Sequence, residues 1–278
     1  MRVRQLLLQV ITIVFLGLLG LFVLSPIYFL VINSLKPFNE IVTSFTALPK
    51  ALTFDNYPMV WERMHYEITF LNTAYLALGS AVVTIIFGAM AGYRLQRSNN
   101  RLSRFLLLFI ICGLIIPFQV IMVPMTQMMT QILQLNNNLH ALIFLYAGLY
   151  MPTSVFIFHG FSKTIPREMD EVAMIDGSGP FRTFFQIIFP LLAPAISTMA
   201  VFTVVWTWND LLVAMLMIDD QAYMTLTRRQ AAFIGYYSGS EWDFFVTSLF
   251  MSSLPIMIFY ACLQKYVQKG LVSGAVKG

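Results

Sequence analysis

The chain has few charged residues and almost no cysteine. Only 11% of its 278 residues are charged, and its two cysteines are Cys112 and Cys262. Both cysteines fall inside apolar runs, which excludes a disulfide framework and a cysteine-based metal site. The three histidines, His65, His140 and His159, are far apart in the sequence. We therefore expect no bound metal.

Motifs for catalysis and nucleotide binding are absent as well. The sequence has no GxxxxGK[ST] element, and no glycine-rich turn follows a predicted strand. It also lacks an arrangement of serine, histidine and acid that would indicate a catalytic triad. We expect a chain that is not an enzyme and that holds no cofactor of its own.

Apolar residues dominate what is present. Hydrophobic residues make up 58% of the chain, the mean hydropathy is +0.75, and 25 residues are phenylalanine. A soluble domain could not cover so much apolar surface. A helix of about 20 residues crosses the hydrocarbon core of a membrane, and six apolar runs have this length. They are 6–32, 68–93, 105–124, 141–161, 191–218 and 244–263. The sequence predicts an all-α membrane protein, a single transmembrane domain over 1–278.

The basic residues are distributed unevenly between the two sides of such a protein. If the chain starts inside, 12 of the 17 lysines and arginines lie on the same side as the termini. The positive-inside rule then places both termini in the cytoplasm, together with the loop 162–190 and the tail 264–278. The net charge of +4 is thus a signal of topology. It does not indicate nucleic-acid binding, and the expected surroundings are lipid.

The internal loop carries strong helix signals. Thr164 and Pro166 suit a helix start, and three acids follow in the first turn, Glu168, Asp170 and Glu171. Asp176-Gly177 is typical of a helix end, and Pro180 then begins a second short helix. One apolar face of the first helix is predicted at Ile165, Met169, Val172 and Ala173.

A helix of about three turns is marginal in water and needs something to pack against. Its acidic polar face does not suit an anionic membrane surface, where basic residues are usual. Physical reasoning therefore leaves two alternatives. The loop is either a docking element for a protein partner or a simple connection between two spans.

The spacing of this loop resembles a known family. Glu171-Val172-Ala173, then Gly177, then Ile187 and Pro190 are similar to the pattern that ABC-importer permeases present to their ATPase subunits. That pattern is EAA, three residues, G, nine residues, I, one residue, LP. The departures are Val172 in place of alanine and Phe189 in place of leucine, and both retain an apolar side chain.

Two further segments extend the resemblance over most of the chain. "WTWNDLL" (206–212) is similar to an element in sugar-importer permeases, and "KYVQKGLVSGAVKG" (265–278) looks like the C-terminal signature of the MalG-like branch. The resemblance implies a type I ABC importer architecture, with six transmembrane helices and a coupling-helix loop between helices 4 and 5.

The resemblance also implies partners and a function. It predicts a permease subunit for a sugar or oligosaccharide in a bacterial or archaeal cell membrane. Its partners would be a second permease, forming a heterodimer, an ATPase dimer that uses ATP and Mg²⁺, and an external solute-binding protein. The absence of lysine and arginine inside the spans mildly favours a neutral substrate.

Site residues follow from the same resemblance. The residues implied to contact the ATPase are Glu171, Val172, Ala173, Asp176, Gly177, Ile187 and Pro190. In the resembled branch the tail also reaches the ATPase, which implicates Lys269, Gly270 and Gly274.

A second candidate site surrounds the acid in the fifth span. Asp210 is costly to bury in a membrane, by roughly 3 kcal/mol, so it should face a partner or a water-filled cavity. Its neighbours Trp206, Trp208 and Asn209 are suited to stack on and hydrogen-bond a sugar. They are equally suited to hold one permease subunit to another, and the sequence leaves both alternatives open.

Other transporter classes compete with this prediction. A proton-coupled secondary transporter would need several ionisable residues at the midplane and internal repeats. The chain shows one buried acid and no evident repeat. An ABC permease for a different solute, such as a polyol or glycerol phosphate, is the other alternative.

Overall fold

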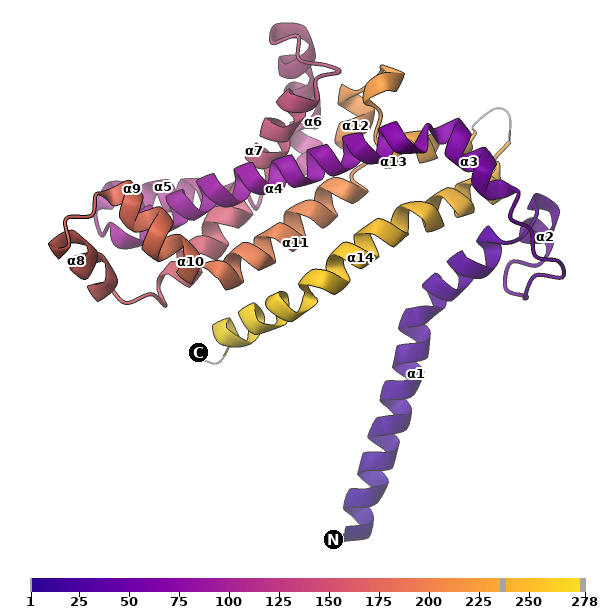
Figure 1. Cartoon of the computed structure of the whole chain (residues 1–278), viewed down its shortest axis with the longest axis horizontal. Coiled ribbons are helices and arrows are strands. Elements are labelled where there is room, and N and C mark those ends of the chain that lie inside the picture. The colour runs from indigo at the N-terminus through magenta and orange to yellow at the C-terminus, as the bar shows by residue number, and fades with distance from the viewer. Residues whose placement is uncertain (1, 236–238, 276–278) are drawn as a thin grey trace. The chain divides into compact units, whose positions relative to one another are not determined.

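The computed structural model describes residues 2–235 and 239–275, and these residues form helices joined by short connections (Figure 1). Within these ranges there is no strand. The only extended pairing found there is an isolated bridge between Ile234 and Ser240. The predicted all-α fold is confirmed.

The chain divides into two compact units. The first unit comprises residues 1–66 and 229–254, and the second comprises 67–228 and 255–278. The helices of the first unit are α1 (Arg2–Ser34), α2 (Phe38–Thr43), α3 (Asn56–Met64), the 3₁₀ turn η4 (Ala231–Phe233) and the first part of α14 (Trp242–Ala275).

Helix α1 is an apolar helix with little cover from the chain itself. Its side chains between Leu8 and Leu24 are exposed, with Phe22 exposed by 75%. The helix contains Pro26 without a break. Such a surface is stable only against lipid or another protein, as expected of a membrane span.

A buried lysine organises the connection after α1. Lys36 has no exposed surface. Its Nζ donates hydrogen bonds to Asn33 Oδ1 at 3.1 Å and to the carbonyls of Ser44 at 2.9 Å, Phe45 at 3.3 Å and Ala47 at 2.5 Å. These acceptors compensate the removal of the charge from water and fix the path of the segment.

The second unit holds most of the remaining helices. They are α4 (Tyr66–Arg97), α5 (Arg101–Cys112), α6 (Phe118–Gln127), the π-helix η1 (Met128–Ile132), α7 (Leu139–Ser162), α8 (Glu168–Ile175), α9 (Pro180–Thr183), the π-helix η2 (Phe184–Ile188), α10 (Phe189–Leu191), α11 (Ala193–Asn209), α12 (Leu212–Met217), the 3₁₀ turn η3 (Gln221–Tyr223) and α13 (Leu226–Gln230), which crosses the boundary between the units.

Helix α7 is central to the second unit, because it packs against α4, α5 and α11. Ser154 Oγ on α7 donates a hydrogen bond to the carbonyl of Thr84 on α4 at 3.0 Å. A Cβ atom on Gly92 would lie 2.7 Å from the backbone nitrogen of His159. Small residues at this contact allow the backbones of α4 and α7 to approach closely.

Among the residues that the structure describes, four helices are long and apolar enough to cross a membrane. Their spans are Leu8–Ser34, Tyr66–Arg97, Leu139–Ser162 and Trp242–Gln264. A fifth arises if the bent pair Pro180–Leu191 and Ala193–Asn209, which meets at 79°, counts as one. The predicted runs 6–32, 68–93, 141–161 and 244–263 each fall within one helix.

The other two predicted runs are interrupted. The run 105–124 is not a single helix, because α5 ends at Cys112 and α6 begins only at Phe118. Pro117 directly precedes α6, and a proline disfavours helical geometry at the residue before it. The run 191–218 breaks at Asp210, whose backbone is extended, between α11 and α12.

The tail that follows the last apolar run is helical in the described residues. Glycines and lysines in this composition are typical of a flexible end, but α14 continues as a helix to Ala275. Lys269, Gly270 and Gly274 lie on its last turns, and their side chains are outside the described part of the structure, as are residues 276–278.

Candidate functional site

The first candidate site is the loop that contains α8, at the left end of Figure 1. Glu168, Asp170 and Glu171 occupy the first turn of α8, where the helix dipole favours negative charge. The residue before the helix is Arg167, and no described side chain caps the helix start. The Thr164 hydroxyl donates its hydrogen bond to the carbonyl of Phe161. The predicted cap at Thr164 is therefore wrong, because α8 begins too far along the chain for this side chain to reach its free amides.

The end of α8 is a glycine-dependent turn. Gly177 has a φ of 71°, in the left-handed region. Its N–H donates to the carbonyl of Met174 at 3.1 Å, and the N–H of Ser178 donates to the carbonyl of Ala173 at 2.9 Å. This pair of bonds is the Schellman arrangement, which requires a positive φ. The predicted helix end at Gly177 is confirmed.

The surface of α8 presents carboxylates beside apolar side chains. Glu171 and Val172 are exposed, and Ile175 is 84% exposed, whereas Ala173 is buried. The single apolar face predicted over Ile165, Met169, Val172 and Ala173 is wrong. Ile165 is buried but lies before the helix. Within the helix, Ala173 faces inward and Val172 faces outward.

An ion pair holds α8 to the end of α4. Arg97 Nε lies 2.7 Å from Asp170 Oδ2, and the Tyr93 hydroxyl donates a hydrogen bond to Asp170 Oδ1. The Arg97 guanidinium also donates to the carbonyls of Ile165 at 3.1 Å and Pro166 at 3.3 Å. Sequence reasoning missed this cluster, because it counted Arg97 only among the basic residues that indicate topology. The available signals in the sequence were the acids of the loop helix and the arginines around Arg97.

The second arm of the loop, which runs from α9 to α10, also lies against α4. Pro180 begins α9 as predicted, and the chain then passes through η2 and α10. The ring of Phe184, which is buried, lies 5.6 Å from the ring of Tyr93. Ile187 lies in η2 and is half-buried, whereas Pro190 lies in α10 and is exposed. Tyr93 thus contacts both arms of the loop.

The second candidate site is a hollow of about 490 Å³ at the two interrupted helices. It lies at the connection between α5 and α6 and at the connection between α11 and α12. Residues in the middle of α7 form another wall. The lining residues are Gly113, Ile116, Phe118, Ile121, Leu149, Tyr150, Val205, Trp206, Asn209, Asp210 and Val213.

Asp210 has a defined structural role at this hollow. Its Oδ2 accepts hydrogen bonds from the N–H groups of Val213 at 3.0 Å and Ala214 at 3.2 Å, and from the Tyr146 hydroxyl at 2.9 Å. Its carbonyl accepts from Thr227 Oγ1 at 2.6 Å. The carboxylate therefore satisfies free amides in the first turn of α12 and stabilises the break.

The structure separates the two tryptophans of this segment. Trp206 is 40% exposed and lines the hollow, with its ring 5.3 Å from that of Tyr150. Trp208 is only 7% exposed and packs edge-on against Phe70. Trp206, Asn209 and Asp210 therefore share one site, and Trp208 belongs to the core. Sequence reasoning missed Tyr146 and Tyr150.

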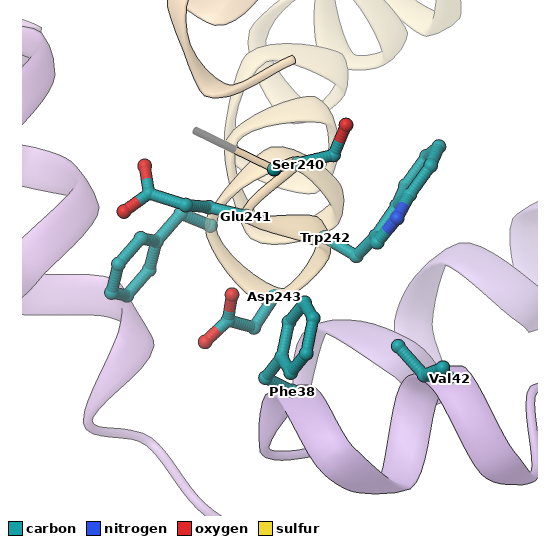
Figure 2. Close-up of a pocket in the computed structure, with 8 residues that line it drawn as sticks. Phe38, Val42, Ser240, Glu241, Trp242 and Asp243 are labelled. Atoms are coloured by element: carbon teal, nitrogen blue, oxygen red, sulfur yellow. The ribbon is translucent and has the colours of Figure 1, made fainter. Parts of the chain in front are cut away.

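A further pocket, of about 550 Å³, lies in the first unit. Figure 2 shows that its lining comes from α2 and from the segment that begins α14. Glu241 at its edge is held by two hydrogen bonds from Arg63, at 2.9 Å and 3.0 Å, and the Arg63 guanidinium lies over the ring of Phe244. The described residues contain no cluster of three metal-ligating side chains here or elsewhere.

A comparison with known families covers most of the chain, including this loop. Residues 84–273 match the family described as the inner membrane component of binding-protein-dependent transport systems. The chain belongs to this family. Its members are permease components of transporters and are not enzymes, and the family is one of multi-pass membrane proteins. The resemblance to MalG-like ABC-importer permeases is confirmed.

Several curated relatives align with nearly the whole chain. A probable permease for starch degradation products from Thermoanaerobacterium thermosulfurigenes is 34% identical over 95% of each chain. A melibiose, raffinose and stachyose import permease from Bacillus subtilis is 37% identical over 91% of each chain. A multiple sugar-binding transport system permease from Streptococcus mutans is 32% identical over 93% of each.

A solved structure shares the fold. The chain matches a bacterial ABC transporter involved in the import of the acidic polysaccharide alginate, with a TM-score of 0.76. The match covers 94% of this chain and 96% of that chain at 20% identity. The architecture is therefore that of an ABC-importer permease, and the alternative of a proton-coupled secondary transporter is not favoured.

Proposed function

We propose that this chain is a permease subunit of an ATP-driven importer for a sugar or oligosaccharide. The support is its family, together with relatives whose names refer to sugar import. A second permease would complete the pathway as a heterodimer, and an external binding protein would deliver the sugar. ATP and Mg²⁺ would act at separate ATPase subunits, since this sequence lacks a nucleotide-binding motif.

The outward surface of α8 carries the proposed coupling to the ATPase. Helix α8 has eight residues, and Glu171, Val172 and Ile175 are exposed on it. These side chains contribute little to packing within the chain, so their surface is available to a partner. Its mixture of carboxylates and apolar groups suits a groove in a protein with basic and apolar walls. Asp176 and Gly177 end the helix, and Ile187 and Pro190 lie in the second arm.

The orientation follows from the distribution of basic residues. With the loop 162–190 and both termini in the cytoplasm, α8 faces the compartment that holds ATP. Closure of the ATPase dimer would then move α8 and shift a two-state equilibrium between inward-open and outward-open forms. The last turns of α14, with Lys269, Gly270 and Gly274, would add a second contact.

Charge reversal tests this coupling surface. We expect Glu171→Lys to reduce co-purification of the ATPase with the affinity-tagged chain by about tenfold, because it places a cation at the centre of the contact. Arg101→Glu is the matched control, since Arg101 is also exposed and lies on the same predicted side. Equal recovery of the ATPase with both variants would contradict the proposed role of α8.

A further inference from the structure

We propose that the hollow between the interrupted helices is a contact site for a neutral sugar, with Trp206 as its stacking surface. The proposal rests on the proposed function as a sugar permease and adds the residues of this subunit that contact the sugar. It also separates the two alternatives that the sequence leaves open for Trp206, Asn209 and Asp210.

The position of the hollow is the first argument. Irregular backbone at membrane depth is tolerated where it lines a cavity or is buried in protein. Here the breaks of two helices, at 113–117 and at 210–211, meet at one hollow beside the middle of α7. Discontinuous helices of this kind form the substrate sites of many membrane transporters.

The aromatic lining is the second argument. Trp206 keeps 40% of its surface exposed although Tyr150 and Phe202 lie against it, with ring centroids at 5.3 Å and 5.4 Å. These neighbours hold the indole in place and leave part of it open toward the hollow. An immobilised aromatic ring offers the flat apolar surface that the C–H face of a pyranose requires.

Polar acceptors next to this ring are the third argument. Oδ2 of Asp210 is occupied by three donors, whereas Oδ1 has no hydrogen-bond partner within the described part of the chain. The Asn209 amide nitrogen donates to the carbonyl of Val205 at 2.8 Å, which leaves the amide oxygen as an acceptor. Sugar hydroxyls are donors of the matching kind.

The charge of the lining selects the class of sugar. None of the described residues that line the hollow is lysine, arginine or histidine, and Asp210 is the only ionisable group among them besides Tyr150. An uncompensated phosphate or uronate would face a carboxylate in a medium of low dielectric constant, which is strongly unfavourable. The size of about 490 Å³ lies in the range of small-molecule sites.

Uptake by the reconstituted importer tests the proposal. The complete complex, in proteoliposomes with its binding protein, is first given melibiose, raffinose, maltotriose and an alginate trisaccharide, and the neutral sugar imported fastest is then used throughout. We expect Trp206→Leu to raise the KM of uptake by about five- to tenfold and Trp206→Phe to restore most of the loss. Asp210→Asn retains an acceptor for the α12 amides. A higher KM in this variant therefore measures the lost contact between the carboxylate and the sugar.

Phe87→Leu is the matched control, because Phe87 is an exposed aromatic residue on α4 and does not line the hollow. It should leave KM unchanged. The proposal is overturned by a normal KM in Trp206→Leu, or by import of the alginate trisaccharide alone or of none of the neutral sugars. Loss of the second permease from purified Trp206→Leu complex would also overturn it, because the hollow would then be a subunit contact.

Failure of this inference is distinguishable from failure of the proposed coupling. The hollow variants are scored by the KM for sugar in complexes whose subunits remain associated. The coupling surface is scored by recovery of the ATPase with Glu171→Lys, a measurement that uses no sugar.

Discussion

Arg97 and Asp170 form an ion pair with a separation of 2.7 Å between Nε and Oδ2, and their side chains are only 11% and 16% exposed. The pair connects the last turn of α4 to the first turn of α8, and Tyr93 donates a hydrogen bond to the same carboxylate. A displacement of α8 would therefore pull on α4, a helix long enough to cross the membrane.

Removal of the arginine should loosen this connection. We expect Arg97→Ala to assemble with the ATPase but to hydrolyse several-fold more ATP per sugar imported, because α8 can then move without α4. Loss of one partner from a largely buried pair costs about 3 kcal/mol, enough to release the loop locally. Simultaneous measurement of ATP hydrolysis and sugar uptake in proteoliposomes gives this ratio.

Two variants provide the controls for the ion pair. Arg101→Ala removes an exposed cation from the start of α5 and should leave the ratio unchanged. Arg97→Lys keeps the charge but not the fork that reaches the carbonyls of Ile165 and Pro166, so an intermediate ratio is expected. A wild-type ratio in Arg97→Ala would show that the pair has no role in transmission.

The turn at Gly177 makes a graded prediction. Its φ of 71° costs any ordinary side chain about 1 kcal/mol, while an added Cβ would meet no atom within 4 Å. Sugar-stimulated ATP hydrolysis should fall in the order Gly177→Asn, Gly177→Ala, Gly177→Pro, since asparagine tolerates this region and proline also lacks the N–H bonded to Met174.

Gly179 offers the matched control for this series. It has a φ of −72°, which any residue adopts, and a Cβ there also meets no atom within 4 Å. Gly179→Ala should behave as wild type. If Gly177→Ala and Gly179→Ala were equally active, the left-handed turn would be dispensable for coupling.

Local patterns predicted much of the fold. Apolar runs located the long helices, the acids of its first turn located α8, Gly177 located its end and Pro180 located the start of α9. These features depend on residues a few positions apart, which a sequence displays directly. The break before Phe118 could not be predicted, because a proline weakens a helix without deciding whether the helix bends or stops.

Contacts between distant segments could not be predicted in the same way. The pairing of Arg97 with Asp170 and that of Tyr146 with Asp210 depend on how helices pack after they form. The separation of Trp206 from Trp208 has a similar origin, since the rotation of α11 decides which ring faces the hollow. Ion pairs and hydroxyl bonds of this kind leave no periodic signal in a single sequence.

The buried lysine of the first unit makes a prediction about stability. Lys36→Met should lower the free energy of unfolding by about 3 kcal/mol, because it leaves Asn33 and three carbonyls without a charged donor. Thermal unfolding of the detergent-purified protein should show a midpoint lower by at least about 6 °C. Lys50→Met, at an exposed position, is the control and should unfold as wild type does.

The contact between α4 and α7 can be tested by a single added methyl group. A Cβ on Gly92 would lie 2.7 Å from the backbone nitrogen of His159 and 2.8 Å from Phe158 Cβ, and backbone cannot turn aside as a flexible side chain can. Gly92→Ala should therefore separate the helices and destabilise the protein by about 1–3 kcal/mol. Gly148→Ala on α7 adds the same methyl group where no atom lies within 4 Å, and higher helix propensity should stabilise that variant slightly. Opposite shifts of the unfolding midpoint in the two variants are expected, and a stabilised Gly92→Ala would mean that α4 and α7 are farther apart in the membrane.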